Sequence, residues 1–181
     1  LRPIAEIMFS DFLAVCFDYV ANEFPKARYM TNGQLGCPLV VRTGNGAGSR
    51  FGAQHSQSVE NWAMMIPGLK VVAPSSPADV IGLLAASVRS DDPVIFFEHK
   101  SLYATKGEVP DGEIVDTLGT AKILRHGRDA TILALALMVP RALAAAETLA
   151  RDHGIDCEVI DVRSLVPLDT RTILESVAKT G

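Results

Sequence analysis

A short apolar segment that runs directly into a glycine-rich loop is the feature that most constrains the fold of this chain. Residues Pro38–Arg42 read Pro-Leu-Val-Val-Arg, which is typical of a buried parallel strand. The loop that follows, Gly44–Ser58, contains four glycines and a Gln-His-Ser-Gln segment. Glycine lets the backbone approach a ligand closely, and open α/β sheets bind ligands at the carboxyl ends of their strands. We therefore expect a ligand site at this loop.

His55 is the titratable side chain of the loop. A histidine gains or loses a proton near neutral pH, so it suits general acid–base chemistry. The alternative is a histidine hydrogen-bonded to the backbone of a long surface loop. The sequence of the loop leaves both interpretations open.

The composition excludes several classes of protein. The 181 residues are 48% hydrophobic and 21% charged, as in an ordinary folded protein. The net charge of −4 and the lack of a Lys/Arg run argue against a nucleic-acid surface. The longest apolar stretch, Ala130–Val139, is too short to span a membrane. Cys16, Cys37 and Cys157 are isolated and odd in number, which indicates a reducing cytoplasm.

Short apolar segments alternate with segments of helical periodicity along the chain. This alternation predicts an α/β fold, a doubly wound parallel sheet with helices on both faces. The expected strands are Pro3–Met8, Cys37–Thr43, Leu69–Ala73, Pro93–Glu98, Ala130–Ala136 and Cys157–Asp161, with a strand and turn over Ala121–Asp129. The expected helices are Asp11–Phe24, Val59–Ile66, Pro77–Arg89, Pro140–His153 and Asp169–Val177.

The ends of several helices are marked by individual residues. Ser76 is the expected N-cap before Pro77, and Asp169 is the expected cap of the last helix. Pro25 is expected to end the first helix. The segment from Tyr103 to Leu118 is polar and has no periodicity, so it reads as a linker. We expect one domain over residues 1–104, a linker over 105–119 and a second domain over 120–181.

Three further segments accompany the glycine loop and carry a family resemblance. They are Arg2–Phe12, Pro67–Asp79 and Asp91–Lys100, which includes the run Phe-Phe-Glu-His-Lys. With the loop they resemble the beta subunit of the thiamin-diphosphate-dependent 2-oxo acid dehydrogenases, the decarboxylating first component of pyruvate, branched-chain and acetoin dehydrogenase complexes. The resemblance covers essentially the whole chain. It implies the C-terminal part of a transketolase-like pyrimidine-binding domain, followed by the truncated start of a transketolase C-terminal-like domain.

The resemblance also implies an activity and partners. The chain is expected to be part of an enzyme that decarboxylates a 2-oxo acid such as pyruvate, or cleaves acetoin, and transfers the acyl group to lipoamide. The implied partners are an alpha subunit, a second beta subunit and a lipoyl-bearing acyltransferase, in the bacterial cytoplasm or the mitochondrial matrix. Nucleic acid and membrane are not expected partners. The alternatives are a single-chain transketolase-like enzyme and a non-catalytic α/β interaction module.

Three sets of site residues follow from the resemblance. Phe12 is implied to lie against the aminopyrimidine of thiamin diphosphate, and His55 to act in proton transfer near the lipoyl-bearing partner. Phe12 as one more core residue of its helix is the alternative. Potassium is implied to bind five backbone carbonyls, with an ordinary water-capped helix end as the alternative. Those carbonyls belong to Leu39, Ser87, Val88, Ser90 and Asp92.

Other family elements are not found in this sequence. The glutamate that activates the cofactor is expected upstream of Leu1, and the Mg²⁺-diphosphate motif belongs to the alpha subunit. The chain therefore reads as a piece of a longer polypeptide, inactive by itself. Glu98 and His99 are adjacent in an expected strand, so their side chains should face opposite ways and serve structural roles. The segment Ala27–Met30 favours pyruvate or acetoin over branched-chain substrates.

Overall fold

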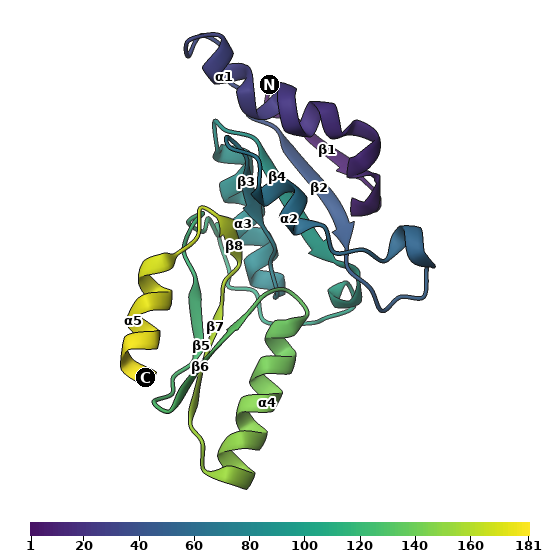
Figure 1. Cartoon of the computed structure of the whole chain (residues 1–181). Coiled ribbons are helices and arrows are strands. Elements are labelled where there is room, and N and C mark those ends of the chain that lie inside the picture. Colours follow the sequence, from purple (N-terminus) through teal and green to yellow (C-terminus); the bar gives the residue numbers. More distant parts are fainter.

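Two β-sheets, one built mainly from each half of the chain, organise the structure (Figure 1). The computed structural model describes residues 1–181. The first sheet has the strand order β1 (Ile4–Ile7), β2 (Val40–Asn45), β4 (Val94–His99), β3 (Lys70–Val72) and β8 (Ser164–Val166). The second has the order β5 (Lys122–Arg125), β7 (Cys157–Asp161) and β6 (Ala130–Ala134).

Five α-helices and four 3-10 or π-helical segments connect the strands. The α-helices are α1 (Phe24–Met30), α2 (Glu60–Met64), α3 (Pro77–Arg89), α4 (Met138–His153) and α5 (Thr170–Thr180). The other segments are η1 (Ser10–Cys16), the π-helical η2 (Tyr19–Glu23), η3 (Ala53–His55) and η4 (Lys100–Leu102), of which only η3 and η4 are shorter than every α-helix. The Ser76 side chain accepts a hydrogen bond from the Asp79 amide, and that of Asp169 from the Thr172 amide. Both predicted caps are therefore confirmed. No helix is both long and apolar enough to span a bilayer.

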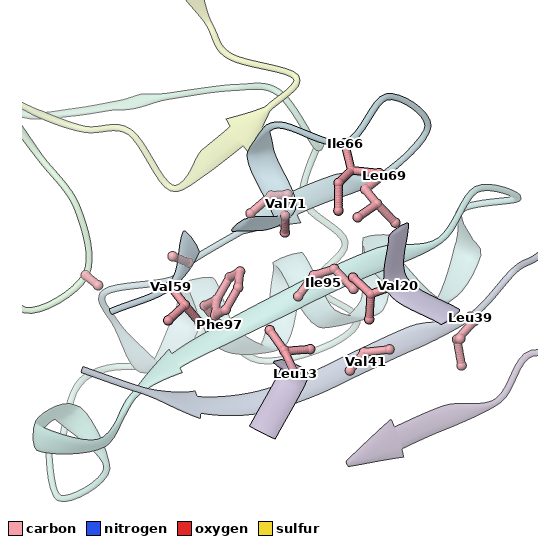
Figure 2. Close-up of a cluster of buried hydrophobic side chains, with 13 residues drawn as sticks. Leu13, Val20, Leu39, Val41, Val59, Ile66, Leu69, Val71, Ile95 and Phe97 are labelled. Carbon is pink, nitrogen blue, oxygen red and sulfur yellow. The ribbon is translucent and has the colours of Figure 1, made fainter. Parts of the chain in front are cut away.

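The three central strands of the first sheet, β2, β4 and β3, are buried on both faces, which explains their apolar sequences, whereas β1 is largely exposed. On one face Ile95 and Phe97 of β4 join a cluster of 13 buried residues that includes Leu13 of η1 (Figure 2). On the other face Phe96 packs with Leu83 of α3. Successive side chains of a strand point to opposite faces, so one apolar run serves both layers. Because packing on both faces holds the central strands, it also holds the carboxyl ends of these strands, where the candidate site lies.

The second sheet also lies between two helices, α4 and α5 (Figure 1). The predicted α/β class with parallel sheets is confirmed, and two further strand pairs that were not expected are antiparallel. The pairs β5–β7 and β3–β8 are antiparallel. Strand β8 was not predicted, because its three residues show no distinct apolar run. Although β8 belongs to the second half of the chain, it pairs with β3 of the first half.

The predicted helix end at Pro25 is also wrong. The helical path continues through η1, η2 and α1 as far as Met30. Pro25 lies in the first turn of α1, directly after the π-helical turn η2. A first-turn amide has no partner within its helix, so a proline costs little there. The change from one helix type to another therefore accommodates the proline without ending the helical path.

A group of polar side chains joins the two halves of the chain, and we name it the junction cluster: the buried Asp79, Asp161 and Arg163 with the half-buried Ser75 and Asp116. Arg163 is 4% exposed and donates to Asp79 at 2.9 Å and to Asp116 at 2.5 Å. Ser75 and the Arg163 amide donate to the carboxylate of Asp161. The φ of 52° at Arg163 lies in the left-handed region, which its surroundings must enforce.

Candidate functional site

The site lies where β1, β2 and β4 end together at one edge of the first sheet. These strands are parallel and in register, so that Ile7 lies beside Thr43 and Thr43 beside Phe97. Their carboxyl ends lead into η1, the glycine loop and η4, respectively. This edge is where open α/β sheets bind ligands. The fold therefore places three ligand-accessible segments side by side.

Four rings meet at this edge, and we name them the aromatic cluster: Phe9, Phe12, Phe51 and His55. The His55 ring lies 4.3 Å from Phe9 and 5.3 Å from Phe12, measured between centroids. The interplanar angles of 79° and 89° are edge-to-face arrangements, which aromatic pairs favour. The structure thus brings together the two residues that the sequence proposed for catalysis and cofactor binding.

Phe12 differs from its neighbour Leu13 in its exposure. Its side chain is 39% exposed, whereas the adjacent Leu13 is 1% exposed and lies in the core. The short helical turn therefore directs Leu13 inward and leaves part of the Phe12 ring open to solvent. A partly exposed ring beside a histidine offers a flat surface for a heteroaromatic ligand.

Both ends of the glycine loop are tied to the edge of the sheet. The Gly46 amide donates to the Gln57 carbonyl at 2.9 Å, and the Gln57 amide donates to the Asp11 carboxylate at 3.2 Å. Gly46 has φ 84°, and a side chain there would collide with the ring of His99. Only glycine fits this combination of backbone and contact. The base of the loop is therefore closed, and His55 lies two residues before the Gln57 anchor.

Asn45, at the end of β2, is a site residue that the sequence reasoning missed. It is 1% exposed, and its oxygen accepts hydrogen bonds from the Ser10 hydroxyl at 2.7 Å and the Val59 amide at 3.3 Å. Its amide nitrogen donates to Glu60 at 2.7 Å. One side chain thus connects η1, β2 and the start of α2. Its place between two glycines, directly after an apolar segment, was the signal that could have identified it.

Two buried charges next to the aromatic cluster were also missed. Lys100 is 9% exposed, and its ammonium lies 5.6 Å from the centroid of the Phe9 ring. Asp11 is 6% exposed. The Lys100 nitrogen and one Asp11 oxygen have no hydrogen-bond partner in the chain. Burial lowers the pKa of Lys100, and the negative charge of Asp11 opposes that shift.

Glu98 and His99 have separate hydrogen-bond partners, although both line one cavity at the start of α3. Arg42 donates to both carboxylate oxygens of Glu98, at 2.7 and 3.0 Å. His99 instead accepts a hydrogen bond from the Ser101 amide at 3.2 Å. Burial lowers the pKa of His99, and the charges of Lys100 and Arg141 add to that effect. A cavity of about 340 Å³ lies beside these residues at the start of α3.

The carbonyls proposed for potassium lie around the end of α3 and already have donors. The residues are Leu39, Ser87, Val88, Ser90 and Asp92. The Arg2 guanidinium donates to the Val88 carbonyl at 3.2 Å and to the Ser90 carbonyl at 2.7 Å. The Val94 amide donates to the Leu39 carbonyl at 2.9 Å, and the other two carbonyls accept hydrogen bonds within the turn. Potassium binding here stays a prediction.

The remaining metal-ligating residue types are dispersed. No three side chains among the histidines, cysteines, aspartates and glutamates gather as a metal site would require. All three cysteines are free thiols.

Two family models match the chain. The transketolase pyrimidine-binding domain matches residues 1–106, and the transketolase C-terminal domain matches residues 119–181. Over all 181 residues the chain is 52% identical to the beta subunit of acetoin:2,6-dichlorophenolindophenol oxidoreductase from Cupriavidus necator, covering 53% of that protein. It is 48% identical to the pyruvate dehydrogenase E1 component subunit beta of Rickettsia felis, covering 55%.

Two further relatives extend these similarities. The chain is 46% identical to the 2-oxoisovalerate dehydrogenase subunit beta of Bacillus subtilis, again covering 55% of it. A solved structure described as a split gene transketolase, inactive beta4 tetramer, aligns with a TM-score of 0.80 and 27% identity, over 99% of this chain and 55% of that one. The chain thus spans about half the length of the curated relatives that it matches.

Proposed function

Because this chain belongs to the transketolase pyrimidine-binding domain family, we propose that it acts as part of the beta subunit of a thiamin-diphosphate-dependent dehydrogenase. The enzyme decarboxylates a 2-oxo acid such as pyruvate, or cleaves acetoin, and passes the acyl group to lipoamide. The observation that carries the proposal is the contact between Phe12 and His55 at the carboxyl edge of the sheet. The relatives that are 46–52% identical, all named as dehydrogenase or oxidoreductase beta subunits, support it.

The residues present fit one end of thiamin diphosphate. The partly exposed ring of Phe12 is available to the aminopyrimidine, which is a flat heteroaromatic ring. When bound, thiamin diphosphate supplies the electron sink for cleavage of the carbon–carbon bond next to the substrate carbonyl. The diphosphate and Mg²⁺ are held by the alpha subunit in this proposal. Phe12 would then hold the pyrimidine end of the cofactor, and the alpha subunit its diphosphate end.

His55 is the group that moves a proton in this proposal. Its ring is half-buried, and its contacts with Phe9 and Phe12 fix its plane without using its nitrogens. A nitrogen of His55 is thus free to donate a proton to the substrate carbonyl oxygen or to accept one from it. The tied ends of the glycine loop keep the ring near the cofactor pyrimidine. Proton transfer and acyl transfer then occur at one edge of the sheet.

The partners follow from the same similarities. We place an alpha subunit and a second beta subunit in the complex, with a lipoyl-bearing acyltransferase as the acceptor of the acyl group. The compartment is the bacterial cytoplasm or the mitochondrial matrix. Acetoin and pyruvate are favoured over branched-chain substrates, as the order of identities of 52%, 48% and 46% supports. The transketolase alternative has less support, because the split-gene transketolase is 27% identical.

The test is to purify the protein with its alpha subunit and to measure turnover with acetoin, pyruvate and 3-methyl-2-oxobutanoate. His55→Ala is expected to lower turnover about 100-fold, the scale of a lost acid–base group, while thiamin diphosphate affinity stays within about 2-fold. His153→Ala, which changes an exposed histidine at the end of α4, is the matched control and should leave turnover unchanged.

Two outcomes would contradict this proposal. Loss of cofactor affinity with unchanged turnover at saturation would make His55 a binding residue. Tight, Mg²⁺-dependent binding of thiamin diphosphate without the alpha subunit, measured by calorimetry, would contradict a cofactor site shared between chains. Turnover of a sugar phosphate in place of all three substrates would support the transketolase alternative.

A further inference from the structure

The aromatic cluster has a buried positive charge beneath it that no step of the proposed reaction uses. The Lys100 ammonium lies 5.6 Å from the centroid of Phe9, and Phe9 lies 4.3 Å from the ring of His55. Lys100 is 91% removed from solvent and its nitrogen has no hydrogen-bond acceptor in the chain. The Lys100 ammonium therefore contacts the aromatic cluster through the face of the Phe9 ring. A cation is attracted to that face by the negative charge density of the ring.

Asp11 supplies the opposite charge and a second link to His55. One of its oxygens accepts the Gln57 amide at 3.2 Å, and the other has no partner. Its negative charge favours the protonated form of Lys100. Gln57 lies two residues after His55 in the glycine loop. Lys100 and Asp11 therefore act on His55 from two sides, one through a ring and one through the backbone.

A contribution to folding stability does not explain why Lys100 and Asp11 are buried here. A buried ammonium without a hydrogen bond costs free energy, and an apolar side chain of similar length would fill the same volume without that cost. The pair also lies at the carboxyl edge of the sheet, next to the reacting residues, and not in the middle of the core. The burial of Lys100 and Asp11 is thus best explained by the neighbouring side chains whose positions they fix.

We propose that Lys100 and Asp11 are positioning residues: Lys100 holds the Phe9 ring against His55, and Asp11 holds the end of the glycine loop that carries His55. The geometry of His55 is fixed by the two together. The consequence for catalysis rests on the proposed function of His55, whereas the consequence for the position of the ring does not. The two parts can therefore be tested separately.

The position of His55 can be tested by chemical modification of the protein with diethyl pyrocarbonate, followed at each histidine by mass spectrometry. Lys100→Met is expected to raise the modification rate of His55 about 5-fold, since one cation–π contact is lost. The rates at His126 and His153 are internal references. Lys106→Met, which removes an exposed lysine of the segment between the domains, is the matched control and should change nothing.

A double variant shows whether Lys100 acts through Phe9. Phe9→Leu should itself raise the His55 rate, and Lys100→Met should add nothing in that background. If Lys100→Met raises the His55 modification rate by the same factor with and without Phe9→Leu, the proposal is wrong. It is also wrong if Lys100→Met alone leaves that rate unchanged. Thermal melting checks that each variant is folded. Lys100→Arg keeps the positive charge, so its His55 modification rate should stay within about 2-fold of the parent rate. This variant is measured if Lys100→Met unfolds.

Turnover of the assembled enzyme gives the catalytic consequence. Lys100→Met and Asp11→Ala, which removes the acceptor of the Gln57 amide, should each lower kcat about 10-fold with little change in KM, because a misplaced acid–base group slows the reaction more than it weakens binding. A rise in KM with unchanged kcat would make Lys100 a substrate-binding residue instead. If the modification rates change as expected but no turnover is found with any substrate, the positioning holds and the proposed function fails.

Discussion

The carboxyl edge of the first sheet and the junction cluster both contain buried charges, but the two regions treat them differently. At the junction, Arg163 donates to Asp79, to Asp116 and to the Thr120 carbonyl. At the edge, the Lys100 nitrogen and one Asp11 oxygen remain without partners. The paired charges serve the assembly of the two domains, whereas the unpaired ones lie next to the residues proposed for chemistry. At the junction only the Nε of Arg163 lacks a partner, and its other two guanidinium nitrogens bind three groups, whereas the Lys100 ammonium has no hydrogen bond. A buried cation without any hydrogen bond therefore distinguishes the candidate site from the junction.

The largest expected effect is at the junction, and it tests whether pairing there stabilises the fold. Arg163→Met leaves Asp79 and Asp116 without their shared partner, so we expect the free energy of unfolding to fall by about 3–5 kcal/mol. Urea denaturation measures this. Arg151→Met, which removes an exposed arginine on α4, is the control and should have almost no effect. If Arg163→Met changes the free energy of unfolding only slightly, charge pairing at the junction does not stabilise the fold, and the two regions do not differ in this respect.

A second test concerns Asp161, whose pKa is raised to about 6, first by burial and also by the charge of Asp79. The folded protein holds this proton more tightly than the unfolded chain. The resulting stability is complete below about pH 4 and is lost as the pH rises through about 6. Asp161→Asn keeps a neutral side chain that can bond to Ser75 and the Arg163 amide. Above pH 6 it should be more stable than the parent, by at most about 3 kcal/mol.

Denaturation curves at pH 4.5 and pH 8 would measure this difference. The advantage of Asp161→Asn should be small at the lower pH and largest at the higher one. Equal advantages at both values would show that Asp161 is already ionised in the folded protein. The junction would then tolerate an extra negative charge, and its pairing would be less complete than the contacts indicate.

The smallest expected effect is at the edge of the sheet, where it separates binding from folding. Phe12→Ala should weaken thiamin diphosphate binding by about 1–3 kcal/mol, comparable to the loss of other stacking aromatics. Leu13→Ala, one residue along, should instead destabilise the fold by about 2–5 kcal/mol, because Leu13 is 1% exposed. Cofactor titration of the assembled enzyme and thermal melting measure the two. If Phe12→Ala melts the protein as strongly as Leu13→Ala and leaves cofactor affinity unchanged, Phe12 is a core residue.

Elements with a local chemical signal were predicted well. The start of α3 follows from Ser76 and Pro77, and β7 has the bounds expected from its apolar run. Elements that depend on distant contacts were not. The antiparallel strand β8 has only three residues and is formed by pairing with β3. Pro25 was taken as a helix end because the change to a π-helical turn before it has no sequence signature.

The sequence by itself determined the fold class and singled out His55, and the family resemblance added Phe12 to the candidate site. Glycines after a strand, a histidine in the loop and helical periodicity are local properties that short segments carry alone. Only the tertiary structure decided that Phe12 and His55 touch, that Lys100 lies under Phe9, and that Arg163 joins three acidic or carbonyl groups across the junction. Ring contacts and charge pairing depend on which distant segments fold side by side, and no local pattern specifies that arrangement.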